Sequence, residues 1–221
     1  MGDESEAITT VLFDMDGVIV DSERYWHDEQ PDHIFPKTLE GEQPDLTETT
    51  GMYYKEISDY LDEEYETVVS KAEFVDIFDE VASEIYSERV DLLDGFHEIR
   101  DELADRDVPV AIVTSSPPSW YEIVVDRFDI EVDEIITAEQ LDADGKPEPD
   151  IYEKAAEIVG RPPQECLVVE DSKNGVKSGY RAGMFVVAYR AEHNADTDLS
   201  TADVVVDDPA KLREEILSRA G

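Results

Sequence analysis

Short apolar runs of strand length alternate with longer amphipathic stretches along this chain, and that alternation limits the folds it can adopt. The apolar runs are Thr10–Phe13, Val108–Val113, Glu134–Thr137, Cys166–Val169, Met184–Ala188 and Asp203–Val206. Most are uninterrupted, as in strands that are buried on both faces. The amphipathic stretches are Phe96–Arg106, Ser119–Phe128, Asp150–Val159, Asn174–Ala182 and Pro209–Arg219. Strand alternating with helix predicts an α/β fold, with a parallel sheet covered by helices on both faces.

One long gap breaks this rhythm, between Phe13 and Val108. The gap has no comparable strand, and its apolar spacing is typical of amphipathic helices. We expect these helices at Ser22–Phe35, Glu48–Leu61 and Ser70–Ser87, with a loop at Pro36–Pro44. The sequence therefore predicts a helical insertion at residues 20–88 and a sheet domain built from residues 1–19 and 89–221.

The net charge of the chain limits the kinds of partner that it can bind. Asp and Glu total 57 against 18 Lys and Arg, which gives a net charge of −39. Such a field repels nucleic acid and anionic membranes, so we expect neither as a partner. The acidic residues are spread along the whole chain, which indicates a solvated surface. The balance resembles that of proteins from salt-loving microbes, because at ~1 M salt the Debye length of about 3 Å screens the repulsion.

The sequence gives few signs of export. Its start is acidic and lacks the apolar core of a signal peptide, and no run approaches the ~18 apolar residues of a membrane span. Its single cysteine, Cys166, suits a reducing compartment. We therefore expect a cytoplasmic protein.

Carboxylates follow two of the predicted strands directly. Asp14 and Asp16 end the first, and Glu170 and Asp171 end the fourth. Because ligands of open α/β sheets bind beyond the carboxyl ends of the strands, these side chains can share one site. Such an oxygen-rich site suits Mg²⁺. The Asp-x-Asp spacing is common in so acidic a chain, so the first pair alone does not separate a catalytic pair from a solvated turn.

Hydroxyl groups and one lysine complete the candidate site. Thr114 and Ser115 end the second predicted strand, where they could hold phosphate oxygens or cap the next helix. Lys146 lies between Gly145 and Pro147 in a predicted loop and could bridge a carboxylate and a phosphate. Each feature alone also fits an ordinary turn or surface loop, and their joint order along the chain favours a single site.

The same stretches resemble the haloacid dehalogenase superfamily. The matching segments are residues 12–23, 113–116, 145–152 and 169–176, which read LFDMDGVIVDSE, VTSS, GKPEPDIY and VEDSKNGV. The resemblance spans residues 11–184 and implies a Rossmann-like parallel sheet core with an inserted α-helical cap. One large subgroup with this arrangement contains phosphatases and β-phosphoglucomutase-like enzymes.

The resemblance implies a role for each residue. Asp14 is the nucleophile that forms an aspartyl phosphate, and Asp16 protonates the leaving group and then activates water. Thr114, Ser115 and Lys146 hold the phosphoryl group. The metal residues are Asp14, Asp16 through its carbonyl, Asp171 and Glu170, and the cofactor is Mg²⁺.

Two departures from family patterns bear on the activity. Asp16 is present, whereas the dehalogenases lack this second aspartate, so phosphoryl transfer is favoured. Phosphomutase caps resemble a Lys-Gly-x-x-Arg pattern, whereas here Thr50-Gly51 is followed by Tyr54. We therefore expect a phosphatase acting on a small phosphorylated metabolite, with a sugar phosphomutase and a non-catalytic phospho-ligand-binding protein as alternatives. The cap residues considered for substrate choice are Arg24, His27, Tyr54 and Lys55.

Overall fold

A parallel sheet forms the base of the molecule in the computed structural model, which describes residues 7–49, 52–140 and 145–221. Within the described residues the sheet has six strands in the order β3-β2-β1-β4-β5-β6. They are β1 Thr10–Phe13, β2 Val110–Thr114, β3 Glu134–Thr137, β4 Cys166–Glu170, β5 Phe185–Tyr189 and β6 Val204–Val206. Every pair of neighbouring strands is parallel, so the expected α/β sheet is confirmed.

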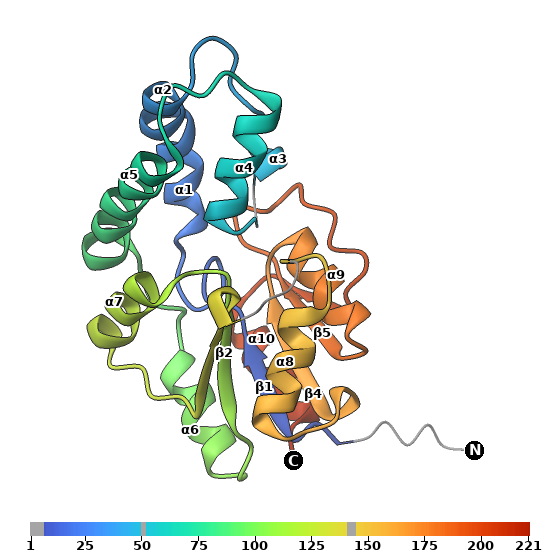
Figure 1. Cartoon of the computed structure of the whole chain (residues 1–221). Helices are drawn as coiled ribbons and strands as arrows, with labels where there is room; N and C mark the ends of the chain where they lie inside the picture. The colour runs from blue at the N-terminus through green and yellow to red at the C-terminus, as the bar shows by residue number, and fades with distance from the viewer. Residues whose placement is uncertain (1–6, 50–51, 141–144) are drawn as a thin grey trace.

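The central strands are buried on both faces because helices cover each side. Along β1, Val11 and Phe13 join one apolar core, and Leu12 between them joins the other. Helices α6 (Phe96–Ala104) and α10 (Pro209–Arg219) pack on one face of the sheet (Figure 1). Helices α8 (Asp150–Val159) and α9 (Lys173–Arg181) pack on the other. The uninterrupted apolar runs of the sequence reflect this double burial.

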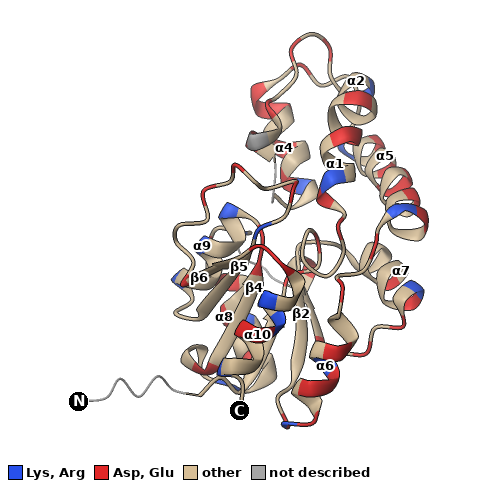
Figure 2. Ribbon diagram, turned by 180° about the vertical axis from the view of Figure 1, so that it is seen from behind, with Lys and Arg blue, Asp and Glu red and all other residues tan. Residues whose placement is uncertain are grey.

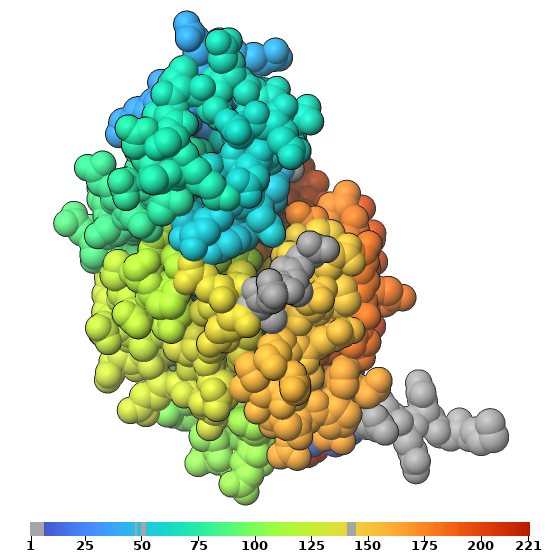
Figure 3. Space-filling model, viewed as in Figure 1, coloured from blue at the N-terminus to red at the C-terminus, as the bar shows by residue number. Residues whose placement is uncertain are grey.

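A group of helices, here called the cap, lies above the carboxyl edge of the sheet (Figure 1). Its elements are α1 Glu23–Glu29, η1 Gln30–Ile34, α2 Phe35–Thr38, α3 Leu46–Thr49, α4 Tyr54–Glu64, α5 Lys71–Glu84 and η2 Ile85–Arg89. Helix α7 (Pro118–Phe128), which follows β2, packs against α5 and η2. Atoms of the cap rest directly on those of the sheet part (Figure 3). Helices occupy the chain between β1 and β2, and a separate cap domain at residues 20–88 stays a prediction.

The cap differs from the sequence prediction at two places. The predicted loop at Pro36–Pro44 begins later, because α2 continues to Thr38. Pro36 is in the first turn of α2, where the missing N–H costs no helical hydrogen bond. The single helix predicted at Glu48–Leu61 is wrong: α3 ends at Thr49 and α4 begins at Tyr54. The intervening sequence includes Thr50 and Gly51, which are poor helix formers.

Short 3₁₀ turns complete the chain at η3 (Ala138–Gln140), after β3, and η4 (Pro163–Glu165), before β4. No helix among the described residues combines the length and the apolar character needed to cross a membrane.

Candidate active site

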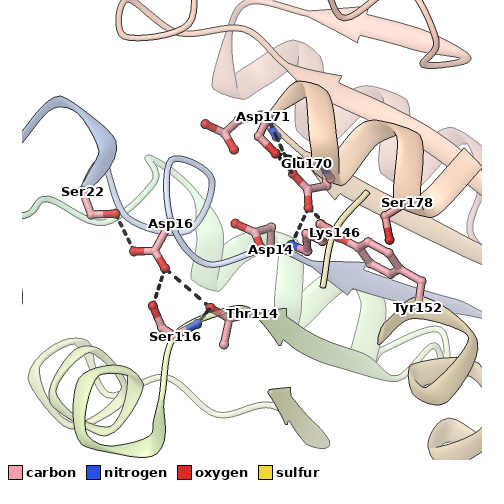
Figure 4. A network of polar contacts seen from close by, with 12 residues as sticks. Asp14, Asp16, Ser22, Thr114, Ser116, Lys146, Tyr152, Glu170, Asp171 and Ser178 are labelled. Atoms are coloured by element: carbon pink, nitrogen blue, oxygen red, sulfur yellow. Dashed lines mark hydrogen bonds and ion pairs between the residues drawn. The ribbon is translucent and has the colours of Figure 1, made fainter. Parts of the chain in front are cut away.

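Asp14 stands at the carboxyl end of the central strand. Its backbone N–H donates to the carbonyl of Val169 across the β1–β4 pair at 2.9 Å, which extends the sheet register to the residue after β1. The chain then turns sharply, with the N–H of Gly17 donating to Val20 O at 2.7 Å and Gly17 at φ +79°. A glycine suits this left-handed position. The turn places Asp14 and Asp16 beside the ends of β2 and β4 (Figure 4).

Lys146 joins the first strand to the fourth. Its Nζ donates to Asp14 Oδ1 at 2.5 Å and to Glu170 Oε1 at 2.6 Å, and all three side chains are buried. The loop that carries it is fixed by α9, because Ser178 Oγ donates to Glu148 O at 2.6 Å and Arg181 Nη1 donates to Pro147 O at 3.0 Å. Lys146 is therefore held in place, unlike a flexible surface lysine.

Glu170 is saturated with hydrogen bonds. Its Oε1 also accepts from the Tyr152 hydroxyl at 2.8 Å, and its Oε2 accepts from the N–H of Asp171 and from the N–H and hydroxyl of Ser172. The carboxylate lies so close to α9 that a Cβ at Gly175 would be 1.9 Å from Oε1. The local structure thus fixes Glu170, and through it the position of Lys146.

Asp16 is surrounded by hydroxyl donors. Ser22 donates to Oδ1 at 2.6 Å and Ser116 donates to Oδ2 at 2.7 Å (Figure 4). The hydroxyl of Tyr86 also donates to Oδ1 at 2.6 Å. The Thr114 hydroxyl is 3.5 Å from Oδ2. Tyr86 comes from the cap element η2, so the cap contributes directly to the surroundings of Asp16.

Of the three residues predicted to hold phosphate, Thr114 and Ser115 lie at different depths of the site. Thr114 is fully buried, and its Oγ1 accepts from the N–H of Ser116 at 3.0 Å. Thr114 therefore supports Asp16 and the loop that follows β2. Ser115 lines the cavity above Asp14 together with Ser116 and Lys146. This cavity, about 80 Å³ in volume, lies between the sheet edge and the cap and is called the cap cavity below.

Asp171 is held by a histidine. His193 Nε2 is 2.6 Å from Asp171 Oδ2, and the side chain of Asn194 donates to the backbone carbonyl of Asp171 at 2.8 Å. A Cβ at Gly17 would be 2.1 Å from Asp171 Oδ2, so the turn after β1 must be a glycine for this pair to fit.

Burial and mutual repulsion shift the acids of the site. Burial raises the pKa of Asp14 well above its ordinary value; Lys146 opposes the shift, and neighbouring carboxylates add to it. Burial, followed by repulsion from Glu170, likewise raises the pKa of Asp171. Although burial opposes it, the pKa of Lys146 rises because Asp14 and Glu170 favour its charged form. One buried cation thus faces several buried carboxylates, which leaves an excess of negative charge.

The donor set fits a hard divalent cation. Asp14, Glu170 and Asp171 are buried and offer oxygens that all lie within 4.8 Å of one another. Mg²⁺ prefers carboxylate oxygens, and its charge would offset the excess negative charge of the site. Asp14 and Asp171 have the freer oxygens, since both oxygens of Glu170 already accept hydrogen bonds.

Several contributing residues have no motif of their own. Tyr86 and His193 lie outside the segments matched in the sequence, and only the fold brings them to the site. Tyr152, in contrast, ends the matched segment 145–152. Ser116 follows the Thr114–Ser115 pair and could have been found by its neighbourhood. Their contacts support the predicted residues.

The cap candidates separate into two groups. Tyr54 lines the cap cavity. Arg24 instead pairs with Asp21, Lys55 pairs with Glu139, and His27 lines a neighbouring cavity. Thr50 and Gly51, on which the comparison with mutase caps depends, lie outside the described residues.

Fold and site together define an α/β enzyme that gathers buried carboxylates, one lysine and hydroxyl groups at the carboxyl edge of its sheet. Residues 8–183 match the haloacid dehalogenase-like hydrolase family, and the chain belongs to this family. It is 33% identical over 207 residues to hexitol phosphatase A of Escherichia coli (strain K12), with 88% of each chain covered. It is 32% identical over 123 residues to validoxylamine A 7'-phosphate phosphatase of Streptomyces hygroscopicus subsp. limoneus, covering 55% of this chain and 57% of that protein.

Solved structures of other proteins share this fold. The β-phosphoglucomutase of Clostridium difficile superposes with a TM-score of 0.76 at 23% identity, with 96% of each chain covered. CbbY of Rhodobacter sphaeroides, in a complex with xylulose-(1,5)bisphosphate, superposes with a TM-score of 0.77 at 19% identity, covering 93% of this chain and 96% of that one. The predicted superfamily and fold are confirmed, and the chain is a phosphoric monoester hydrolase of the haloacid dehalogenase type.

Proposed function

We propose that this protein is a Mg²⁺-dependent phosphatase that hydrolyses a small phosphorylated metabolite through an aspartyl phosphate on Asp14. The observation that carries the proposal is the position of Asp14 in the cap cavity, beside Asp16 and Lys146. Lys146 binds Asp14 Oδ1, and within the described residues Oδ2 accepts no hydrogen bond. That second oxygen is the available nucleophile.

Lys146 and Ser115 are the groups that would hold the phosphoryl oxygens, because both line the cap cavity. We assign Thr114 the supporting role of positioning Asp16 and the loop after β2. Phosphoryl transfer requires mainly positioning and neutralisation of charge, which a buried ammonium and fixed hydroxyl groups provide.

Two chemical steps follow from this arrangement. In the first, an oxygen of Asp14 forms a bond to phosphorus, the bond from phosphorus to the leaving oxygen breaks, and the carboxyl of Asp16 gives that oxygen its proton. In the second, water attacks phosphorus, its proton passes to Asp16, and the bond from phosphorus to Asp14 breaks. The hydroxyl donors around Asp16 orient it for both transfers.

Asp14, the backbone carbonyl of Asp16 and Asp171 are the groups proposed to hold Mg²⁺. Glu170 lies within the same cluster, and its hydrogen bonds favour a role in holding Lys146 over direct ligation. When bound, Mg²⁺ would neutralise charge on the phosphoryl oxygens and keep Asp14 ionised.

The test is phosphate release from a panel of phosphorylated metabolites at molar KCl, with and without Mg²⁺. Because relatives are named as hexitol phosphatase and validoxylamine A 7'-phosphate phosphatase, sugar-alcohol and cyclitol phosphates belong in the panel. We expect Mg²⁺-dependent release that disappears in Asp14→Asn. Isomerisation of a sugar phosphate without net release would instead support a mutase, and binding without turnover would support the non-catalytic alternative.

A further inference from the structure

Apolar side chains form one wall of the cap cavity, and we expect this wall to lie against the leaving group. Aromatic rings form much of it, contributed by Trp26, Tyr54, Phe78, Tyr86 and Trp120. The rings are packed on one another, with centroids 5.4 Å apart for Trp26 and Trp120 and 4.8 Å apart for Tyr54 and Trp120. A wall packed this tightly is rigid, so it selects what can lie against it.

Polar atoms of this wall are largely committed elsewhere. Trp26 Nε1 donates to the Tyr86 hydroxyl at 3.2 Å, and that hydroxyl donates to Asp16. Trp120 Nε1 donates to Asp79 Oδ1 at 2.6 Å. These indoles therefore offer the substrate carbon surface.

Gln30 supplies a neutral polar group to the cap wall. Gln30 lines the cap cavity, and its Oε1 accepts from the Thr49 hydroxyl at 2.9 Å. Its amide nitrogen donates no hydrogen bond to any other described residue. A hydroxyl of the leaving group is a fitting partner for this free amide.

No second cation is available to the leaving group. Among the described residues that line the cap cavity, Lys146 alone is basic, and it already faces Asp14 and Glu170. The undescribed residues 1–6, 50–51 and 141–144 contain no Lys, Arg or His. Glu23 adds a further carboxylate to the wall.

In the two cavities that adjoin the cap cavity, acidic residues line the wall together with the basic ones. The first, about 190 Å³, shares Ser115 and Lys146 with it and adds Lys55, which pairs with Glu139 at 2.6 Å. It also adds Glu56 and Asp59. The second, about 520 Å³, lies beyond Glu23; its basic residues Lys173, His27 and His193 are accompanied by Glu23, Asp171, Glu192, Asp196 and Asp198.

We infer that the substrate is a monophosphate whose leaving group is an uncharged, hydroxyl-bearing carbon chain, and that Gln30 and the aromatic wall exclude leaving groups with a second anionic group. The inference rests on the proposed function and refines it. An anion placed against this wall would lose water and meet no cation, and an unpaired buried charge is costly. A neutral chain can place C–H groups on the rings and one hydroxyl on Gln30.

The test compares two monophosphates whose leaving groups differ at one end, where one is neutral and the other carries a negative charge. Sorbitol 6-phosphate and 6-phosphogluconate share a six-carbon chain, one ending in a CH₂OH group and the other in a carboxylate. We expect kcat/KM to favour the neutral member on the order of 10²-fold, the scale set by an unpaired charge. If neither compound is hydrolysed, each can be measured as an inhibitor of acetyl phosphate hydrolysis. We then expect the neutral compound to have the lower inhibition constant by a similar factor. Equal values, or preference for the carboxylate, would overturn the inference.

Hydrolysis of acetyl phosphate distinguishes a failure of the inference from a failure of the proposed function. Asp14-dependent hydrolysis of acetyl phosphate without discrimination between the paired compounds leaves the proposed function intact and overturns the inference alone. An absence of Asp14-dependent release from every compound overturns both.

Variants of the wall make the test specific. Gln30→Lys places a cation beside the leaving group and should shift the ratio of kcat/KM about 10-fold toward 6-phosphogluconate. Gln30→Met, which adds no charge, should not. Met52→Lys, at another position lining the cap cavity, is the second variant if Gln30→Lys fails to fold. Lys55→Gln should leave the ratio unchanged; a selective loss of the anionic substrate would show that Lys55 supplies the missing cation and would overturn the inference.

Discussion

At the scale of single residues, Glu23 shows what the accumulation of carboxylates does to the site. It lines the cap cavity, where burial and repulsion from Asp171 and Asp16 raise its pKa to about 8. An acid whose pKa rises on folding contributes stability below its unfolded pKa and loses it as the pH passes the folded value. In the absence of metal, Glu23 should therefore weaken the fold increasingly from about pH 5 to about pH 9.

Glu23→Gln should remove that contribution. In EDTA we expect the variant to melt several degrees above the parent at about pH 9, with a smaller difference at about pH 5. Asp28→Asn, at an exposed carboxylate of the same helix, is the matched control and should not reproduce the effect. A Glu23→Gln advantage that is the same at both pH values would contradict the prediction.

His193 is the second residue whose replacement we expect to have a measurable effect. Burial lowers its pKa, so at neutral pH its Nε2–H donates to Asp171 Oδ2 across 2.6 Å and orients that carboxylate. Partners that orient metal ligands typically affect metal affinity by about 10- to 100-fold. We expect His193→Ala to weaken Mg²⁺ binding within that range, measured as the Mg²⁺ concentration that raises the melting temperature.

A conservative variant separates orientation from simple packing. His193→Gln retains a donor and should recover part of the Mg²⁺ affinity lost in His193→Ala. If both variants respond to Mg²⁺ as the parent does, His193 does not act through Asp171.

Most of the predicted site residues come from motifs at strand ends, and the sequence can predict that such ends meet. Asp14, Glu170 and Asp171 are together because parallel strands bring their carboxyl ends to one edge. Lys146 joins them from the loop before α8. His193 and Tyr86 could not be found this way. Each contacts the site through a side chain from a loop or helix whose position depends on tertiary packing.

At the scale of elements, the start of α9 and the end of β4 form one unit. Ser172 caps the helix by accepting from Gly175 N at 2.9 Å, and Glu170 lies directly over Gly175. Helical propensity favours alanine over glycine by about 1 kcal/mol, so Gly175→Ala alone should help the helix. The Cβ, however, would occupy the place of the Glu170 carboxylate.

We therefore expect Gly175→Ala to reduce kcat/KM on the order of 10²-fold, because a shift of about 1 Å in Glu170 displaces Lys146. The readout is steady-state kinetics, with circular dichroism to show that the helix persists. Tyr180→Ala, at an exposed position of the same helix, is the control and should change activity little. Retention of full activity in Gly175→Ala would show that Glu170 can move without cost.

Element boundaries in the sheet part follow the sequence closely, whereas those in the cap do so less well. Strands β1 and β3 and helices α8 and α10 have the predicted limits, because buried apolar runs and amphipathic stretches with clear ends define them. The break between α3 and α4 was missed, since apolar residues continue on both sides of it.

At the scale of the whole molecule, acidic residues are distributed over both the cap and the sheet part (Figure 2). With a net charge of −39, like charges repel throughout the surface at low ionic strength. We expect the melting temperature to rise from dilute buffer to molar KCl, because a Debye length of about 3 Å at 1 M suppresses this repulsion. No rise would contradict the prediction of a salt-adapted protein.

A pair of substitutions checks that the salt effect is electrostatic. Glu63 and Glu64 are exposed at the carboxyl end of α4, where the helix dipole also disfavours negative charge. Replacing both with lysine should raise the melting temperature in dilute buffer and reduce its dependence on KCl. An unchanged salt dependence would point to a cause other than surface charge.

The surroundings of Asp16 have a consequence for the order of events in catalysis. Tyr86 comes from the cap and Ser116 from the loop after β2, yet both donate to this one carboxylate. Lifting the cap would remove one of these donors and admit water to the other side of Asp16. If Asp16 delivers the proton as proposed, proton delivery depends on the same cap contact that covers the substrate, and we expect bond cleavage only while the cap is closed.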